Sequence, residues 1–86
     1  MDVTAARDLI DANSYLTLAT AGADGVPWAS PVWFGHDDYT TFFWMSQPTA
    51  RHSQNIAERA DIGIVIFDST VSPRDRNAVF VEAGRR

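Results

Sequence analysis

The sequence predicts a mainly β domain with two short helices, and three observations lead to this prediction. Several short segments alternate apolar and polar residues with the period of a strand. Turn residues, such as those at 22–25, join consecutive strand segments so closely that an antiparallel sheet is expected, and enough such strands can close into a barrel. The 86 residues allow one domain, spanning 1–86, and leave no room for a second.

The first half of the chain predicts one helix and two strands. A helix is expected over residues 4–11, with Thr4 as its capping residue. Residues 14–20 alternate, with both leucines on one face, and therefore predict a strand. Residues 26–35 alternate again but contain two prolines, which cannot donate ladder hydrogen bonds. This second strand is therefore expected to be an edge or to bulge near Pro31.

The second half of the chain predicts a third strand, a second helix and two more strands. Residues 36–38 are typical of a solvated hairpin tip, and residues 39–46 are rich in the aromatic and β-branched types that strands favour. The sequence Gln-Pro-Thr then breaks the pattern, and a helix is expected over 49–59. The remaining expected elements are strands over 61–67 and 77–83 and a polar loop over 68–76.

Composition excludes several classes of function. Cysteine is absent, which excludes disulfides and thiolate chemistry and favours a cytoplasmic location. The net charge is −4, so the chain lacks the excess of basic residues that is typical of nucleic-acid-binding proteins, and no nucleic-acid partner is expected. The longest apolar run, 62–67, is far shorter than the roughly 20 residues of a membrane helix, so no membrane partner is expected. His36 stands beside two aspartates, but no further ligand has matching spacing, so no metal site is predicted.

The segment around the second predicted helix carries the strongest chemical signal. The motifs of a nucleophile elbow, a phosphate loop and a zinc peptidase are all absent. The end of the preceding strand supplies Ser46, and a helix beginning at Thr49 offers free N–H groups to an anion. Arg51 and His52 lie in the first turn, where cations oppose the helix dipole and a bound phosphate would relieve the conflict. A solvated Arg51 with His52 packed under the sheet fits the pattern equally well.

Aromatic residues gather on the two strands that the 36–38 hairpin would pair. They could line a slot for a flat ring system, although Phe34 and Phe43 are expected to lie in the core. Trp33 faces away from Phe34, so its ring needs cover from a ligand or from a subunit interface. The fourth aromatic residue of these two strands is Trp44.

Several segments together resemble one known family. The joint order and spacing of these segments are similar to those of the pyridoxamine 5′-phosphate oxidase-like, FMN-binding split-barrel family. The resemblance covers nearly the whole chain and implies an antiparallel Greek-key split β-barrel, a homodimer and FMN bound in the cleft between the subunits. It also implies a further strand after residue 83, so the barrel is expected to be incomplete at its C-terminus. The matching segments are 15–20, 24–27, 30–34, 44–46 and 50–56.

The resemblance also implies roles for particular residues. The family's phosphate-binding segment has an Arg-Lys pair at the helix start; Arg51 matches that Arg, and His52 takes the place of the Lys. Met45 and Ser46 match strand-end positions that touch the flavin or its phosphate, and 31–33 match the strand that borders the flavin ring. The predicted cofactor-binding residues are Pro31, Val32, Trp33, Met45, Ser46, Thr49, Arg51 and His52.

The function implied by the resemblance is that of an FMN-dependent oxidoreductase that transfers a hydride to or from a small molecule, with a deazaflavin as the alternative cofactor. No catalytic side chain is expected, because the flavin carries the redox chemistry. The vitamin B6 oxidases carry basic residues where this chain has Ser30 and Gly35, so pyridoxamine phosphate is not the expected substrate. The alternative is a non-catalytic module that binds flavin or deazaflavin or serves in dimerisation.

Overall fold

The computed structural model describes residues 2–72, 74 and 77–84 of the chain. The mainly β fold with two helices is confirmed in this part; of the predicted 68–76 loop, residues 73 and 75–76 lie outside it. Neither of the helices described is long and apolar enough to cross a bilayer. The elements in chain order are α1 (Val3–Ala12), β1 (Tyr15–Ala21), β2 (Pro27–Asp37), β3 (Thr41–Trp44), α2 (Arg51–Glu58), β4 (Ile62–Phe67) and β5 (Ala78–Ala83).

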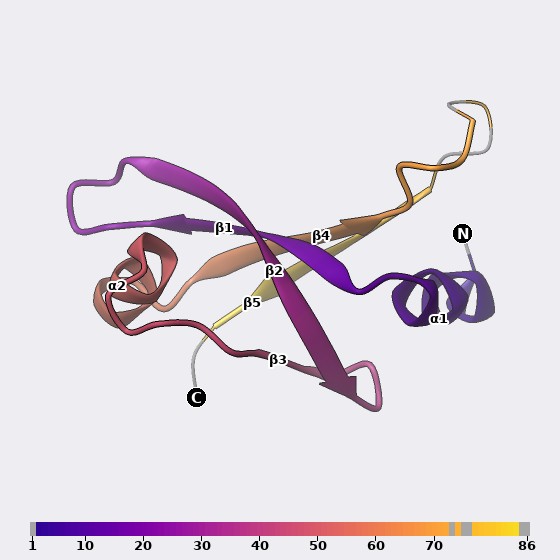
Figure 1. Ribbon diagram of the computed structural model, residues 1–86, viewed down its shortest axis with the longest axis horizontal. Coiled ribbons are helices and arrows are strands. Elements are labelled where there is room, and N and C mark those ends of the chain that lie inside the picture. Colours follow the sequence, from indigo (N-terminus) through magenta and orange to yellow (C-terminus); the bar gives the residue numbers. More distant parts are fainter. Residues whose placement is uncertain (1, 73, 75–76, 85–86) are drawn as a thin grey trace.

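The strands form an antiparallel sheet in the order β3-β2-β1-β4-β5. β1 pairs with β2 along its whole length, from Tyr15 beside Trp33 to Ala21 beside Pro27. Because paired strands twist, the sheet curls into a half-barrel in which β2 crosses steeply over its neighbours (Figure 1). Helix α2 packs beside the hairpin of β1 and β2, while α1 packs against β4 and β5 at the other end (Figure 1).

The hydrophobic core lies on the concave side of the curled sheet. The alternation predicted for β1 is confirmed, since its two leucines are buried while Tyr15, its first residue, is exposed. Partly buried aromatic side chains of β2 and β3, including Phe34 and Trp44, pack against this core. The buried residues of the core are Ile10, Leu16, Leu18, Val32, Ile64 and Ile66.

In the described chain, the prolines of β2 lie in a stretch of the strand that pairs with a neighbouring strand on one side only. Along residues 27–33 the pairing recorded within the described chain is with β1, and the pairing with β3 begins at Phe34. Pro31 therefore lies where the sheet needs no second ladder of hydrogen bonds, as expected for an edge position.

Both helix starts differ from the sequence prediction. Helix α1 is capped by Asp2, whose Oδ1 accepts the N–H of Ala5 at 2.7 Å, so the prediction of Thr4 as the cap is wrong. A carboxylate two residues earlier is a strong capping group that also suits the positive end of the helix dipole. Helix α2 begins at Arg51 rather than Thr49, because residues 47–50 form a separate turn first.

The solvated tip that the sequence predicted over 36–38 is only partly confirmed, since Asp37 and Asp38 are exposed but His36 is half-buried. His36 and residue 37 belong to β2, and the turn follows at 38–40. His36 is half-buried, with its ring stacked on that of Tyr39, and Asp11 of α1 reaches it with 3.0 Å between Nε2 and Oδ1. The hydroxyl of Tyr39 donates to the same carboxylate at 2.5 Å, and the Tyr39 amide donates to His36 Nδ1 at 3.2 Å. Helix α1 therefore stabilises this turn through Asp11. In the turn, Asp38 and Tyr39 adopt the uncommon φ values of 52° and 57°.

The contacts with Asp11 predict a pH-dependent stability. The Tyr39 hydrogen bond, and then that of His36, lower the pKa of Asp11 below its ordinary value of 3.8, and the Asp11 bond raises the pKa of Tyr39 above 10.0. A lowered carboxyl pKa contributes stability that is lost as the pH falls below 3.8, and a raised phenol pKa contributes stability that is lost as the pH rises above 10.0. Tyr39→Phe should therefore lower the melting temperature most between these limits, in melts recorded across the pH range.

Tyr15→Phe is the matched control for this measurement, because it removes an exposed phenol from β1. Equal melting temperatures for Tyr39→Phe and the unmodified chain at neutral pH would show that the contact with α1 does not stabilise the turn.

Candidate functional site

The start of α2 presents backbone donors that have no helical acceptor. Ala50 occupies the N-cap position, and no side chain in the described part caps this end. Since the first N–H groups of an α-helix lack intrahelical partners, those of residues 51–53 are available to an anion. Ser46 Oγ lies 2.7 Å from Ser53 Oγ, so the end of β3 brings a hydroxyl to the helix start as the sequence predicted. Thr49 is exposed in the turn just before the helix.

Arg51, the first residue of α2, lies over an aromatic ring. Its guanidinium carbon is 4.3 Å from the centroid of the Trp28 ring on β2. Among the residues described, the guanidinium makes no hydrogen bond and no ion pair, so its N–H groups are free to bind a ligand. The side chain is exposed, which allows it to remain charged at little cost.

Thr49 and Arg51 also line an open hollow of about 450 Å³ between α2 and the β1–β2 turn. Two carboxylates face this hollow, and each is engaged with the backbone of the turn. Asp24 accepts one N–H at 3.0 Å, and Glu58 accepts another at 2.8 Å. The positive charge of the hollow therefore stands at its Arg51 end, beside the helix start.

Two buried contacts fix α2 against the sheet. The Asn55 side chain donates to the Thr20 hydroxyl at 3.0 Å, and both residues are buried. His52 Nδ1 lies 3.3 Å from Ser30 Oγ, and its ring is only 9% exposed. His52 Nε2 is enclosed and has no hydrogen-bond partner among the described residues. The structure thus places His52 in the packing between helix and sheet, the second of the two interpretations that the sequence allowed.

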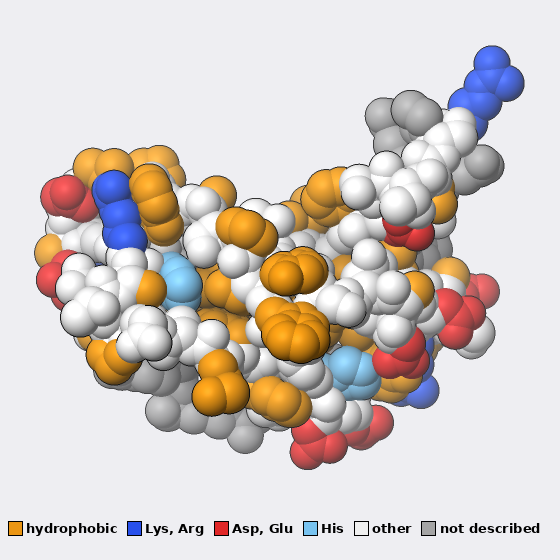
Figure 2. Space-filling model, in the orientation of Figure 1, with side chains coloured by type: hydrophobic (Ala, Val, Ile, Leu, Met, Phe, Trp, Pro, Cys, Tyr) orange, Lys and Arg blue, Asp and Glu red, His pale blue; other side chains and the backbone are white. Residues whose placement is uncertain are grey.

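An exposed apolar surface covers the outer face of β2 and β3. Trp33 is 71% exposed, Phe43 56% and Met45 98%. In Figure 2 the hydrophobic side chains of this face gather over the same two strands. Together with their neighbours Phe34, Gly35 and Trp44, these three residues line a shallow hollow of about 280 Å³. We call Trp33, Phe43 and Met45 the outer aromatic surface.

The prediction that Phe43 lies in the core is wrong, whereas Phe34 does pack against it. The pairing of β2 with β3 sets Phe34 beside Trp44 on the inner face and Gly35 beside Phe43 on the outer face. A Cβ atom at Gly35 would come within 2.5 Å of the Phe43 ring, so the ring occupies the space that a side chain at residue 35 would need. The outer position of Phe43 therefore depends on this glycine.

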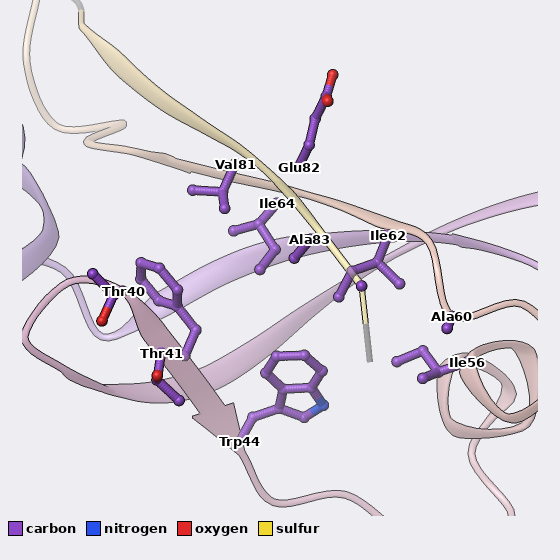
Figure 3. Close-up of a pocket in the computed structure, with 12 residues that line it drawn as sticks. Thr40, Thr41, Trp44, Ile56, Ala60, Ile62, Ile64, Val81, Glu82 and Ala83 are labelled. Carbon is purple, nitrogen blue, oxygen red and sulfur yellow. The ribbon is translucent and has the colours of Figure 1, made fainter. Parts of the chain in front are cut away.

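A third hollow, of about 480 Å³, lies on the inner side between β3, the β4–β5 pair and α2. Figure 3 shows Trp44, Ile56 and Ile62 around it, and the lining is largely apolar. None of the eight predicted cofactor-binding residues lines this hollow. It is therefore separate from the candidate cofactor site.

Five of the eight predicted residues fall into two groups. Trp33 and Met45 lie on the outer aromatic surface. Thr49 and Arg51 line the hollow at the start of α2, and Ser46 contacts Ser53 in the first turn of that helix. The side chain of Val32 belongs to the core, and Pro31 is exposed on the same strand. Sequence reasoning missed Trp28 and Ser53. Strand alternation places Trp28 on the same face as Ser30 and Val32, and this pattern could have indicated that Trp28 faces α2. Only the docking of α2 shows that Arg51 covers the Trp28 ring.

Comparison with known proteins supplies the context of this site. The chain matches the family model described as pyridoxamine 5′-phosphate oxidase over residues 3–84. No curated protein matches it.

Solved structures share the fold of the chain. The heme storage protein HutZ from Vibrio cholerae is 22% identical, with a TM-score of 0.83 over 95% of this chain and 59% of that one. A conserved hypothetical protein from Mycobacterium tuberculosis is 19% identical, with a TM-score of 0.83 over 98% and 51%. A heme binding protein from Mycobacterium smegmatis is 26% identical, with a TM-score of 0.79 over 92% and 33%. The chain thus spans between one third and three fifths of the length of these three proteins.

Proposed function

Because the chain belongs to the pyridoxamine 5′-phosphate oxidase family, we propose that it is an FMN-dependent oxidoreductase that transfers a hydride to or from a small molecule. A deazaflavin is the alternative cofactor. The observation that carries the proposal is the start of α2, which has no side-chain cap, begins with the free guanidinium of Arg51 and has the Ser46 and Ser53 hydroxyls in contact beside its first turn.

The donors at this helix start fit a phosphate group. Residues 51–53 offer backbone N–H groups, which bind anions at helix N-termini, and Arg51 offers paired N–H groups in the geometry of a phosphate edge. Ser46 and Thr49 are exposed and add hydroxyl donors. Every one of these groups is a hydrogen-bond donor, which is the requirement for binding a dianionic phosphate.

The protein's own contribution is binding and orientation. When bound, the flavin supplies the hydride chemistry, so no protein acid or base is required for that transfer. Arg51 and the helix start hold the phosphate end of the cofactor, while Trp33 and Met45 on the outer aromatic surface border the ring and exclude water from it. The backbone of 31–33 runs along the same border.

We extend the proposal to a homodimer with the cofactor at its interface. The outer aromatic surface supports this extension, since three large apolar side chains are exposed around one hollow, on β2, on β3 and on the residue that follows β3. Covering this surface with a second copy of the chain would enclose the ring of a cofactor whose phosphate is held at α2.

Two other functions compete with this one. A non-catalytic module that binds flavin or deazaflavin, or that serves in dimerisation, would use the same phosphate site and the same surface. Haem binding is favoured by the descriptions of two solved structures of the same fold. Haem needs an axial ligand such as His, Met or Tyr. In the described part, His36 Nε2 contacts Asp11 and His52 Nε2 is enclosed, so Met45 is the best exposed candidate.

The visible spectrum of the purified protein, mixed in turn with FMN, a deazaflavin and haemin, separates these functions. We expect saturable binding of FMN or the deazaflavin with a shift of the flavin bands, and turnover when a reduced nicotinamide or deazaflavin donor is added. Binding without turnover would favour the non-catalytic module. A Soret shift that Met45→Leu abolishes, with no flavin binding, would overturn the proposal.

The placement of His52 predicts how FMN affinity depends on pH. Because its ring is enclosed between α2 and Ser30, His52 should not contact the phosphate, so FMN affinity should not fall as the pH rises through the range in which a free imidazole titrates. Titrations of FMN at several pH values measure this. An affinity that falls as the pH rises through that range would show instead that a charged His52 reaches the phosphate.

A further inference from the structure

The stacking of Arg51 on Trp28 joins the candidate phosphate site to the sheet. Trp28 lies near the start of β2 and is 41% exposed, and the Arg51 guanidinium covers its ring at 4.3 Å. At this distance a cation is attracted by the ring face, and tryptophan is the strongest of the aromatic partners. None of the family-based expectations assigned Trp28 a role.

The register of the sheet explains why the two side chains meet. Trp28 is the cross-strand partner of Thr20, and the Thr20 hydroxyl accepts the side-chain N–H of Asn55. Asn55 follows Arg51 by four residues, so both lie on one face of α2. The buried bond between Asn55 and Thr20 therefore places Arg51 over Trp28.

A second contact supports the same placement. Ser30 follows Trp28 by two residues on the same face of β2, and it contacts His52, the neighbour of Arg51 in α2. Two adjacent positions of the helix thus stand over two adjacent inward positions of the strand. The stack is a consequence of how the helix is docked, not of a chance side-chain orientation.

The contact with Trp28 uses none of the N–H groups of the guanidinium in a hydrogen bond. In the described chain none of these five groups is bonded to another residue, so they remain available to a ligand. The ring also limits the rotamers of a long side chain that would otherwise lose this freedom on binding. The stack thus leaves Arg51 ordered before any ligand arrives.

From this geometry we infer that Trp28 is a positioning residue for the phosphate end of the cofactor. It holds the Arg51 guanidinium in a binding-competent orientation beside the start of α2 and acts on the ligand only through Arg51. The inference rests on the proposed function, since it names the residue that prepares the proposed phosphate site.

The test is a double-mutant cycle with two ligands. The dissociation constants of FMN and riboflavin are measured for the unmodified protein, Trp28→Leu, Arg51→Ala and the double variant. Trp28→Leu should weaken FMN binding about two- to fivefold, as expected for a partly exposed cation–π contact, and should leave riboflavin binding unchanged. In the Arg51→Ala background the same substitution should have no further effect on FMN. Trp28→Phe keeps an aromatic face and should restore most of the loss.

The outcomes separate this inference from the proposed function. If Arg51→Ala does not weaken FMN binding, both are overturned. If Arg51→Ala weakens it but Trp28→Leu does not, only the role of Trp28 is overturned. A loss of riboflavin affinity, or an equal loss of FMN affinity in both backgrounds, would show that Trp28 contacts the ligand itself.

A measurement without ligand checks the stack directly. The ring current of Trp28 should shift the NMR signals of the Arg51 side chain, and this shift should be lost in Trp28→Leu and largely kept in Trp28→Phe. Unshifted Arg51 signals in the unmodified protein would overturn the inference, and thermal melts establish that each variant is folded.

Discussion

Arg51→Ala is expected to weaken FMN binding by about 1.5–3 kcal/mol, the range for a hydrogen bond to a charged group. This corresponds to roughly a tenfold to 150-fold rise in the dissociation constant. Arg51 is the cation of the candidate site, it stands at an uncapped helix start, and its guanidinium has no other partner in the described chain. Its loss removes both the charge and the paired donors.

Riboflavin is the discriminating ligand, because it carries the same ring without the phosphate. Its affinity for Arg51→Ala should be nearly that of the unmodified protein. Arg74→Ala is the matched protein control, since it removes the same charge from the loop between β4 and β5. If FMN and riboflavin lose affinity equally, Arg51 does not bind the phosphate.

Trp33→Asp is expected to dissociate the proposed homodimer and to abolish flavin binding. Trp33 is the largest side chain of the outer aromatic surface and is 71% exposed on the described chain. A tryptophan that becomes buried at the centre of an interface typically contributes on the order of 2–4 kcal/mol to the free energy of association. A carboxylate buried in its place must lose its hydration without gaining a partner. Because the cofactor ring is proposed to lie at the same surface, both properties should be lost together.

Light scattering and FMN titration on the same samples measure the two losses. Val3→Asp is the control, because it adds the same charge at another exposed apolar residue, on α1 outside the outer aromatic surface. A monomeric unmodified protein that still binds FMN at micromolar concentration would contradict the shared interface, and so would a Trp33→Asp variant that remains a dimer.

Local sequence patterns predicted most of the secondary structure and part of the candidate site. The alternation around Leu16 and Leu18 was enough to predict β1 and its buried face, because each strand residue points opposite to its neighbours. The position of Arg51 in the first turn of a helix was likewise predictable from the break at residues 47–49. A cation at that position, together with the free N–H groups of the turn, was enough to predict a bound anion.

Other features depended on contacts between distant residues. Alternation alone could not decide which aromatic residues of β3 face inward. That choice follows from the register that pairs Phe34 with Trp44, and it sends Phe43 to the surface. The contact of His36 with Asp11 likewise joins residues that are 25 positions apart in the chain.

The sequence by itself determined the fold class, the order of the elements and which helix is expected to bind a phosphate at its start, but not the first residue of that helix. Only the tertiary structure decided the surroundings of that helix start: His52 turned into the packing beside Ser30, and Arg51 placed over Trp28. The physical reason is that a strand or helix pattern shows which residues share a face, whereas the partner of that face is chosen by long-range contacts such as the bond between Asn55 and Thr20.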